Sequence, residues 1–155
     1  MKTLSAVLTA AVAVAALSTA ASAQDYRQRP TYGQATLRTG FLPDPHVRQL
    51  QSGGPIDATR LGNGCNGMVA NAPDYRIQFT AGRLPLTISA TAQGDTTLVI
   101  NGPDGRWYCN DDSNGLNPSV TFRQPRSGQY DVWVGTYGSQ NLINTRLAVS
   151  EIGRR

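Results

Sequence analysis

Few residues in this chain have side chains that commonly carry out catalysis. Its 155 residues include one histidine, His46, and two cysteines, and only 15% of the residues are charged. The motifs G-x-S-x-G, H-E-x-x-H, G-x-x-x-x-G-K and C-x-x-C are all absent from the sequence. The length is also too small for the two barrels of a trypsin-like protease. The sequence therefore has room for one domain and contains no recognisable catalytic motif.

Lysine is almost absent as well. Lys2 is the only lysine, and the arginines are scattered singly through the chain apart from Arg154 and Arg155 at its end. The formal net charge of +4 is mild. Nucleic-acid-binding proteins gather their basic residues on one face or in runs, so this distribution argues against a nucleic-acid partner.

The first 23 residues have the composition of a secretory signal peptide. Lys2 is followed by an apolar run over residues 4–17, and then by Ala21-Ser22-Ala23, which matches an A-x-A cleavage site before Gln24. The alternative is a membrane anchor, but the run is short for a span and no charged stop follows it. We expect a periplasmic or secreted protein with no membrane span after cleavage.

The rest of the chain divides into a leader and a domain. Residues 24–37 are polar, rich in Gln, Arg and Tyr, and without periodicity, which predicts a flexible leader. Residues 38–155 are expected to form one β-sandwich domain. Its first part, residues 38–66, is rich in Pro and Gly and predicts an irregular lead-in that holds an edge strand at most.

Short alternating runs, separated by turns, dominate the sequence from Tyr75 onward. No amphipathic helix is apparent after the leader, and strand-sized runs with frequent turns are typical of antiparallel sandwiches. We therefore predict an all-β fold, an antiparallel jelly-roll or Greek-key sandwich of about eight strands. Tyr130 follows a tight turn, and we expect its phenol oxygen to bond a nearby backbone group. The predicted strands cover residues 75–79, 84–90, 96–101, 107–109, 120–122, 130–134 and 147–149, with an early one around Met68 and Val69.

Cys65 and Cys109 are the two cysteines of the chain. An even count in an exported protein predicts one disulfide. In the chain-entropy account, a disulfide that closes the loop between Cys65 and Cys109 stabilises the fold by roughly 4 kcal/mol. A catalytic or metal-binding cysteine is the alternative, and it would need His46 as its partner.

Three stretches of the sequence resemble a known family. They are residues 95–105 (DTTLVINGPDG), residues 110–112 (NDD) and residues 125–134 (PRSGQYDVWV). In order and spacing they are similar to the bacterial pre-peptidase C-terminal domain, over about residues 74–150. The resemblance implies a small jelly-roll sandwich that accompanies secreted proteases without being catalytic, and some members bind matrix polymers or calcium. The chain is also similar to small exported proteobacterial proteins labelled "peptidase" by association, yet it has no room for a protease domain.

The loop at residues 110–117 has the highest density of oxygen ligands. Its sequence, NDDSNGLN, is close to the calcium-loop spacing D-x-[DN]-x-[DN]-G, although the first position is Asn and no Glu follows at the twelfth. We expect a Ca²⁺ site here as one hypothesis. Ordinary turn capping by Asn, Asp and Ser is the other. The candidate ligands are Asn110, Asp112, Asn114 and Asn117, joined by Asp95 or Asp104 from neighbouring turns.

Trp133 and Tyr137 alternate with the predicted core residues of their strand. They lie on the face opposite Tyr130, which makes them candidates for an exposed aromatic binding pair. The alternative is that the N-terminal segment covers Trp133. Trp107 shares a strand face with Cys109 and is expected to pack beside the disulfide.

These observations favour an exported, non-catalytic binding or accessory module. Its expected partner is an envelope or extracellular polymer or a partner protein, with Ca²⁺ as the one cofactor considered. A secreted hydrolase is the first alternative, with Asp111 and Asp112 as its candidate carboxylates, although neighbours on a strand point apart. The second alternative is a self-assembling structural surface protein that pairs through open sheet edges.

Overall fold

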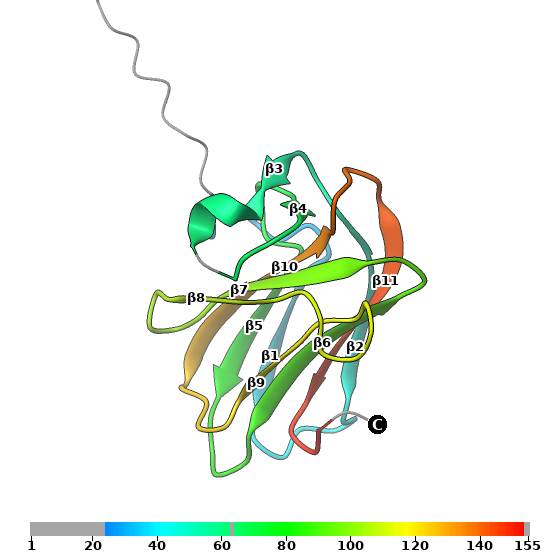
Figure 1. Ribbon diagram of the computed structural model, residues 1–155. Helices are drawn as coiled ribbons and strands as arrows, with labels where there is room; N and C mark the ends of the chain where they lie inside the picture. The colour runs from blue at the N-terminus through cyan, green and yellow to red at the C-terminus, as the bar shows by residue number, and fades with distance from the viewer. Residues whose placement is uncertain (1–23, 63, 154–155) are drawn as a thin grey trace, which may run out of the picture.

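The computed structural model describes residues 24–62 and 64–153, and it is an all-β sandwich of two sheets (Figure 1). One sheet has seven strands and the other has four. Every pair of named strands is antiparallel except β1 and β5, which are parallel. The first sheet contains β1 (Gln34–Arg38), β3 (Ile56–Asp57), β4 (Met68–Val69), β5 (Tyr75–Thr80), β7 (Thr96–Asn101), β8 (Trp107–Asn110) and β10 (Gly128–Thr136). The second contains β2 (His46–Ser52), β6 (Leu86–Ala92), β9 (Ser119–Phe122) and β11 (Ile143–Ser150).

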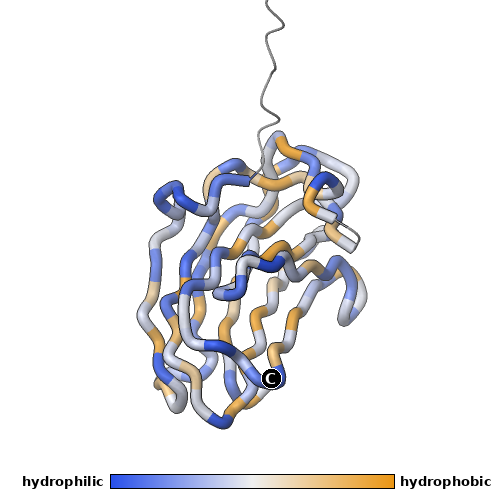
Figure 2. Tube along the Cα trace, turned by 90° about the vertical axis from the view of Figure 1, so that its left-hand side faces the viewer, coloured by the Kyte–Doolittle hydropathy of each residue, from blue (hydrophilic) through white to orange (hydrophobic). Residues whose placement is uncertain are grey.

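The strands predicted from alternation are all present, and the sandwich prediction is confirmed. In β5 the side chains of Tyr75, Ile77 and Phe79 are buried, while those of Arg76 and Gln78 are partly exposed on the opposite face. Hydrophobic positions therefore recur along the trace where the two sheets face each other (Figure 2). Burial of these alternate side chains is the main driving force for the fold.

A second, smaller core lies on the outer face of the seven-stranded sheet. Trp133 and Val99 are fully buried there, beneath Ala58, Cys65 and Val69. The cover comes from β3, β4 and the short 3₁₀ helix η1 (Ala58–Leu61). The prediction of an exposed Trp133 is therefore wrong, because the N-terminal part of the domain folds over that face, as the alternative proposed.

The predicted disulfide is confirmed. Cys65 and Cys109 are bonded with their Cα atoms 4.9 Å apart, and the described residues contain no free cysteine. The bond ties the loop after η1 to the end of β8, at the edge of the smaller core. Trp107 packs against the same cluster, as expected.

The turn before β10 has the predicted tyrosine contact. The Tyr130 hydroxyl donates to the Arg126 carbonyl at 2.8 Å and accepts from the Arg126 N–H at 3.0 Å. Tyr130 is 1% exposed, so its ring packs in the main core while its oxygen satisfies the backbone of the turn.

The segment predicted as a flexible leader, residues 24–37, differs from that prediction. Gln24 is buried, and Gln34–Arg38 forms the edge strand β1 beside β5. The Thr31 and Tyr32 N–H groups donate to the carbonyls of Pro73 and Asp74. The segment lacks periodicity because it lies along a sheet edge and is fixed by backbone hydrogen bonds, which depend little on side-chain pattern.

The lead-in predicted over residues 38–66 contains more regular structure than expected. It contains three elements: the strand β2, which is an edge strand of the second sheet, the short strand β3 and the helix η1. The predicted signal peptide, residues 1–23, lies outside the described residues. Within residues 24–62 and 64–153, no helix is long and apolar enough to cross a membrane.

Candidate functional site

An open groove of about 390 Å³ lies on the surface of the sandwich. It lies between the N-terminal segment, the β7–β8 turn and the beginning of β10. Its lining includes two aromatic and four polar side chains that could contact a ligand. They are Tyr26, Trp107, Asn101, Ser127, Gln129 and Asp131.

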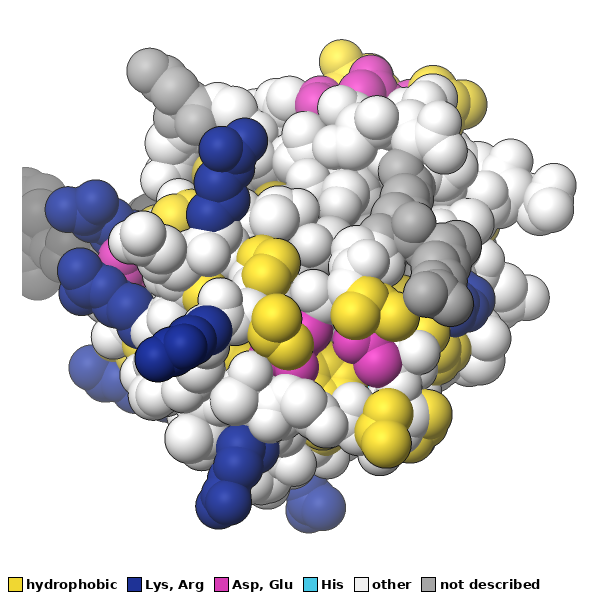
Figure 3. Space-filling view, turned by 90° about the horizontal axis from the view of Figure 1, so that it is seen from below, with side chains coloured by type: hydrophobic (Ala, Val, Ile, Leu, Met, Phe, Trp, Pro, Cys, Tyr) yellow, Lys and Arg dark blue, Asp and Glu magenta, His cyan; other side chains and the backbone are white. Residues whose placement is uncertain are grey.

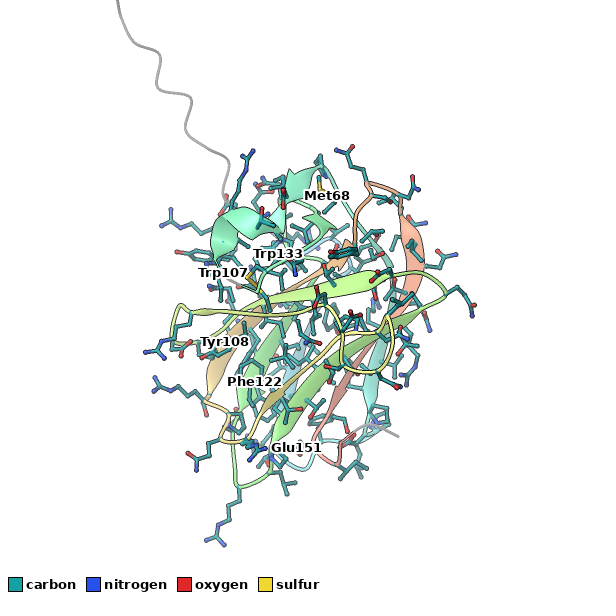
Figure 4. The ribbon with its side chains drawn as sticks, in the orientation of Figure 1. Met68, Trp107, Tyr108, Phe122, Trp133 and Glu151 are labelled. Atoms are coloured by element: carbon teal, nitrogen blue, oxygen red, sulfur yellow. A yellow bond between two sulfur atoms is a disulfide. The ribbon has the colours of Figure 1, made fainter. Side chains whose placement is uncertain are left out.

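The two aromatic side chains are held in different ways. Trp107 is half-buried and packs against Trp133, with ring centroids 5.4 Å apart at an interplanar angle of 51° (Figure 4). Because Trp133 lies in the smaller core, this contact holds Trp107 at the groove wall. Tyr26 is 41% exposed, and the Arg27 guanidinium lies 5.8 Å from its ring centroid. Tyr26 therefore presents an accessible aromatic surface to the groove.

A hydrogen-bonded network forms the floor of the groove. Arg76 Nε donates to Asp131 Oδ1 at 2.6 Å, and Gln129 Nε2 donates to Asp131 Oδ2 at 2.6 Å. Gln78 Nε2 in turn donates to Gln129 Oε1 at 2.8 Å. Side chains of the two strands β5 and β10 thus hold one another in place, which leaves a rigid polar surface.

Arg76 also fixes the wall that carries Tyr26. Its Nη2 group donates to the carbonyls of Tyr26 and Gln28, at 2.5 and 3.0 Å. One guanidinium therefore joins the sheet to the N-terminal segment through three charge-assisted hydrogen bonds. This contact holds the Tyr26 backbone beside the groove.

The groove has the groups for binding rather than for acid–base chemistry. Asp131 is its one carboxylate, and it is 1% exposed and paired with Arg76. A hydrolytic site needs a poised acid, base or nucleophile, and a carboxylate held in an ion pair is a poor proton acceptor. The histidine is elsewhere: His46 Nε2 lies 2.9 Å from the Tyr75 hydroxyl, and burial lowers the pKa of His46, with a smaller contribution from Arg48.

Sequence reasoning missed this groove. Its residues come from a turn, from the start of a strand and from the segment read as flexible. The one sequence feature that could have indicated a site here is the turn at residues 101–105 (NGPDG), which lies close before Trp107. Nothing in the sequence places Tyr26 opposite that turn, because their proximity depends on the tertiary contact of Arg76.

The acidic loop uses two of its four predicted ligands, Asn110 and Asn117, for hydrogen bonds of its own turns. Asn110 Oδ1 accepts from Ser113 Oγ at 2.7 Å and from the Ser119 N–H at 2.8 Å. Asn117 Oδ1 accepts from the Ala92 N–H at 2.9 Å. These are the turn-capping contacts of the alternative hypothesis. Asp112 and Asn114 are exposed.

Of the two additional candidate ligands, the structure brings only Asp95 to the loop. The pKa of Asp95 is raised, first by burial and then by the charges of Asp112 and Asp111. Asp104 lies at the far tip of the β7–β8 hairpin, where its carboxylate accepts from the Tyr108 hydroxyl at 2.7 Å. The prediction of Asp104 as a Ca²⁺ ligand of the acidic loop is therefore wrong, because the full length of β7 separates Asp104 from Asp95 and the loop.

No three His, Cys, Asp or Glu side chains among the described residues are grouped closely enough to hold a metal. Calcium binding at the loop stays a prediction. Tyr137, the other member of the predicted aromatic pair, is 49% exposed, and its N–H donates to the Asp95 carbonyl at 3.1 Å. It lies at the opposite end of β10 from the groove.

Known proteins resemble this chain in structure and in sequence. No model of a known protein family matches the chain. The pre-peptidase C-terminal domain of collagenase from Bacillus anthracis is similar in structure, with a TM-score of 0.48 and 14% identity, over 79% of this chain and 99% of that one. A periplasmic inhibitor of g-type lysozyme from Aeromonas hydrophila gives a TM-score of 0.40 and 15% identity, over 76% of this chain and 96% of that one. The domain type named from the sequence motifs is thus among the structural neighbours.

A relative is also found by sequence. An uncharacterized protein of Synechococcus elongatus is 34% identical over 107 residues, which are 68% of this chain and 75% of the relative. An identity of this size over most of both chains implies a common fold and a common origin. The chain belongs to the same family as this uncharacterized cyanobacterial protein.

Proposed function

We propose that this protein is an exported, non-catalytic module that binds a polysaccharide chain of the cell envelope or its surroundings in the groove beside Arg76. The observation that carries the proposal is the pairing of Tyr26 and Trp107 above a floor of amide and carboxylate groups. Sugar rings offer flat apolar faces to aromatic side chains and hydroxyl groups to polar ones. An open groove suits a chain that continues beyond the site at both ends.

Rigidity of the groove supports this proposal. Its floor is cross-linked by the Gln78–Gln129–Asp131–Arg76 network, and its Trp107 wall rests on Trp133 and the disulfide cluster. A preformed site loses little conformational entropy when a ligand binds. The disulfide supports export, because such bonds persist mainly in oxidising compartments.

Co-sedimentation and calorimetry test the proposal. The purified protein is expected to sediment with insoluble peptidoglycan and to bind the soluble probe tetra-N-acetylchitotetraose. Tyr26→Ala removes one aromatic wall and is expected to weaken binding of the soluble probe about fivefold to tenfold. The Tyr26 carbonyl that anchors Arg76 is retained in this variant.

Tyr137→Ala is the matched control, since it also removes an exposed tyrosine but lies away from the groove. We expect it to bind like the unaltered protein. Equal loss of binding in both variants, or absence of binding to both probes, contradicts the proposal. Release of shorter sugars from the probe contradicts its non-catalytic part and favours the hydrolase alternative.

A further inference from the structure

Two carboxylates meet at the lower end of the sandwich, apart from the groove and from the acidic loop. Asp44 lies in the loop between β1 and β2, and Glu151 directly follows β11. The Glu151 N–H donates to Asp44 Oδ2 at 2.9 Å, and the Gly40 N–H donates to Glu151 Oε2. Figure 4 places Glu151 at the opposite end of the molecule from Trp107 and Trp133. From below, acidic side chains are visible among hydrophobic ones (Figure 3).

Each carboxylate has one buried oxygen without a hydrogen-bond partner among the described residues. These atoms are Asp44 Oδ1 and Glu151 Oε1. Glu151 is only 3% exposed, so its free oxygen lies away from bulk solvent. A buried charged oxygen without a partner is costly, and natural structures rarely keep one without an ion or another group to balance it.

The surrounding chain is poor in donors for a simple reason. Pro43 and Pro45 have no N–H group, and the nearby N–H groups of Gly40 and Glu151 are already used. The salt bridges within residues 24–62 and 64–153 involve Arg76 and Arg106, and neither reaches Asp44 or Glu151. Within residues 24–62 and 64–153, neither Asp44 Oδ1 nor Glu151 Oε1 therefore has a hydrogen-bond donor or an ion-pair partner.

We propose that Asp44 and Glu151 bind a hard divalent cation, Ca²⁺, through these two oxygens. Backbone N–H groups already donate to the other oxygen of each carboxylate, which leaves one oxygen of each for the ion. Ca²⁺ accepts carboxylate and backbone carbonyl oxygens together and completes its shell with water. Carbonyl groups of the β1–β2 loop can supply the remaining protein ligands, since prolines remove donors but not acceptors.

Such an ion would join two distant parts of the chain. The β1–β2 loop precedes the edge strand β2, and Glu151 ends β11, the partner of β2. Bound Ca²⁺ would hold the start of β2 and the end of β11 together at the base of the sandwich. It would then stabilise the folded state in proportion to its occupancy, because the unfolded chain does not assemble the two carboxylates.

Calorimetry and thermal unfolding of the purified protein test this site with CaCl₂ as the probe. We expect one bound Ca²⁺ per chain and a rise in melting temperature of about 5 °C or more at saturating CaCl₂, abolished by EDTA. Asp44→Asn and Glu151→Gln should each lose the bound ion and the rise. In EDTA, Glu151→Gln should unfold at the same temperature as the unaltered protein or higher, because a neutral amide replaces the unpaired charge.

Asp112→Asn is the matched control, since it removes a carboxylate from the acidic loop and should retain the response to CaCl₂. Loss of the response in Asp112→Asn with its retention in Glu151→Gln overturns the proposal in favour of the loop. Identical unfolding in CaCl₂ and EDTA also overturns it. In that case a double variant, Arg154→Ala with Arg155→Ala, shows whether the C-terminal arginines neutralise Asp44 and Glu151 instead. Destabilisation of this variant in both buffers would indicate that they do.

Discussion

Arg76 Nε donates to Asp131 Oδ1 at 2.6 Å, and the two side chains are 13% and 2% exposed. This ion pair crosses from β5 to β10 on the outer face of the larger sheet. The same guanidinium binds the carbonyls of Tyr26 and Gln28, so it also joins the N-terminal segment to the domain. Arg76 therefore adds side-chain contacts to the backbone hydrogen bonds that fix residues 24–33, and it holds Tyr26 at the groove.

Arg76→Met should loosen the N-terminal segment and leave the Asp131 carboxylate buried without its ion-pair partner. We expect a loss of about 3 kcal/mol in the free energy of unfolding, measured by urea denaturation. Amide hydrogen exchange over residues 25–33 should become faster even where the protein stays folded. Arg106→Ala is the control, because its contact with Asp104 is 3.9 Å long and its side chain is 80% exposed. A similar loss in both variants contradicts this role of Arg76.

Asp74 should make stability depend on pH. It is buried, and burial raises its pKa to about 7, although its carboxylate accepts from the Val134 N–H at 2.7 Å. Because the folded state holds this proton more tightly than the unfolded state, the contribution of Asp74 to stability falls as pH rises from about 4 to about 7. The full change is on the order of 4 kcal/mol.

Asp74→Asn tests this dependence, since the amide oxygen can still accept from Val134. The free energy of unfolding of the variant, subtracted from that of the unaltered protein at each pH, isolates the Asp74 contribution. We expect the variant to be relatively more stable above pH 7 and the difference to shrink as pH falls. A difference that does not change between pH 4 and pH 8 refutes the raised pKa.

Trp133→Ala should destabilise the protein strongly. The indole is fully buried, contacts Trp107 and donates from Nε1 to the Asn71 carbonyl at 3.3 Å. Removing it leaves a cavity in the smaller core, with an expected loss of about 3–5 kcal/mol in urea denaturation. Tyr137→Ala, on the same face of the strand but exposed, should change stability by less than about 0.5 kcal/mol. Equal effects would mean that Trp133 is not covered as described.

Tyr130→Phe should test the corner before β10. The ring still fills the core, while both hydrogen bonds to the Arg126 backbone are lost. We expect a decrease of about 1–2 kcal/mol in the free energy of unfolding, because the peptide groups of the turn lose a buried partner. Tyr108→Phe is a suitable comparison, since it loses one bond to an exposed turn at Asp104 and should cost less. A cost for Tyr130→Phe no larger than for Tyr108→Phe would contradict the structural role of the corner.

The alternation of apolar and polar residues was enough to predict the strands from Tyr75 to Val149, because a period of two reports which side chains face the core. It also predicted the face on which Trp133 lies, but not what covers that face. The cover consists of β3, η1 and β4, which are short and nearly patternless. Their position is decided by the disulfide and by contacts with Trp133 and Val99, which are distant in sequence.

The same limit applies to the candidate sites. Residues 110–117 were recognisable as oxygen-rich, yet composition alone could not separate ligands from turn caps, and backbone geometry assigns Asn110 and Asn117 to capping. Asp44 and Glu151 are separated by 107 positions, and no local pattern connects them. Their meeting depends on the pairing of β2 with β11.

The sequence by itself determined the all-β class, the disulfide partners, the Tyr130 corner and most strands, because each of these follows from local periodicity, turn chemistry or a count of two cysteines. The tertiary structure decided which faces are covered, that residues 24–37 join the fold, where the groove opens, and which carboxylates meet without partners. These features depend on contacts between residues far apart in the chain, and side-chain pattern along a strand carries no information about what another segment brings to it.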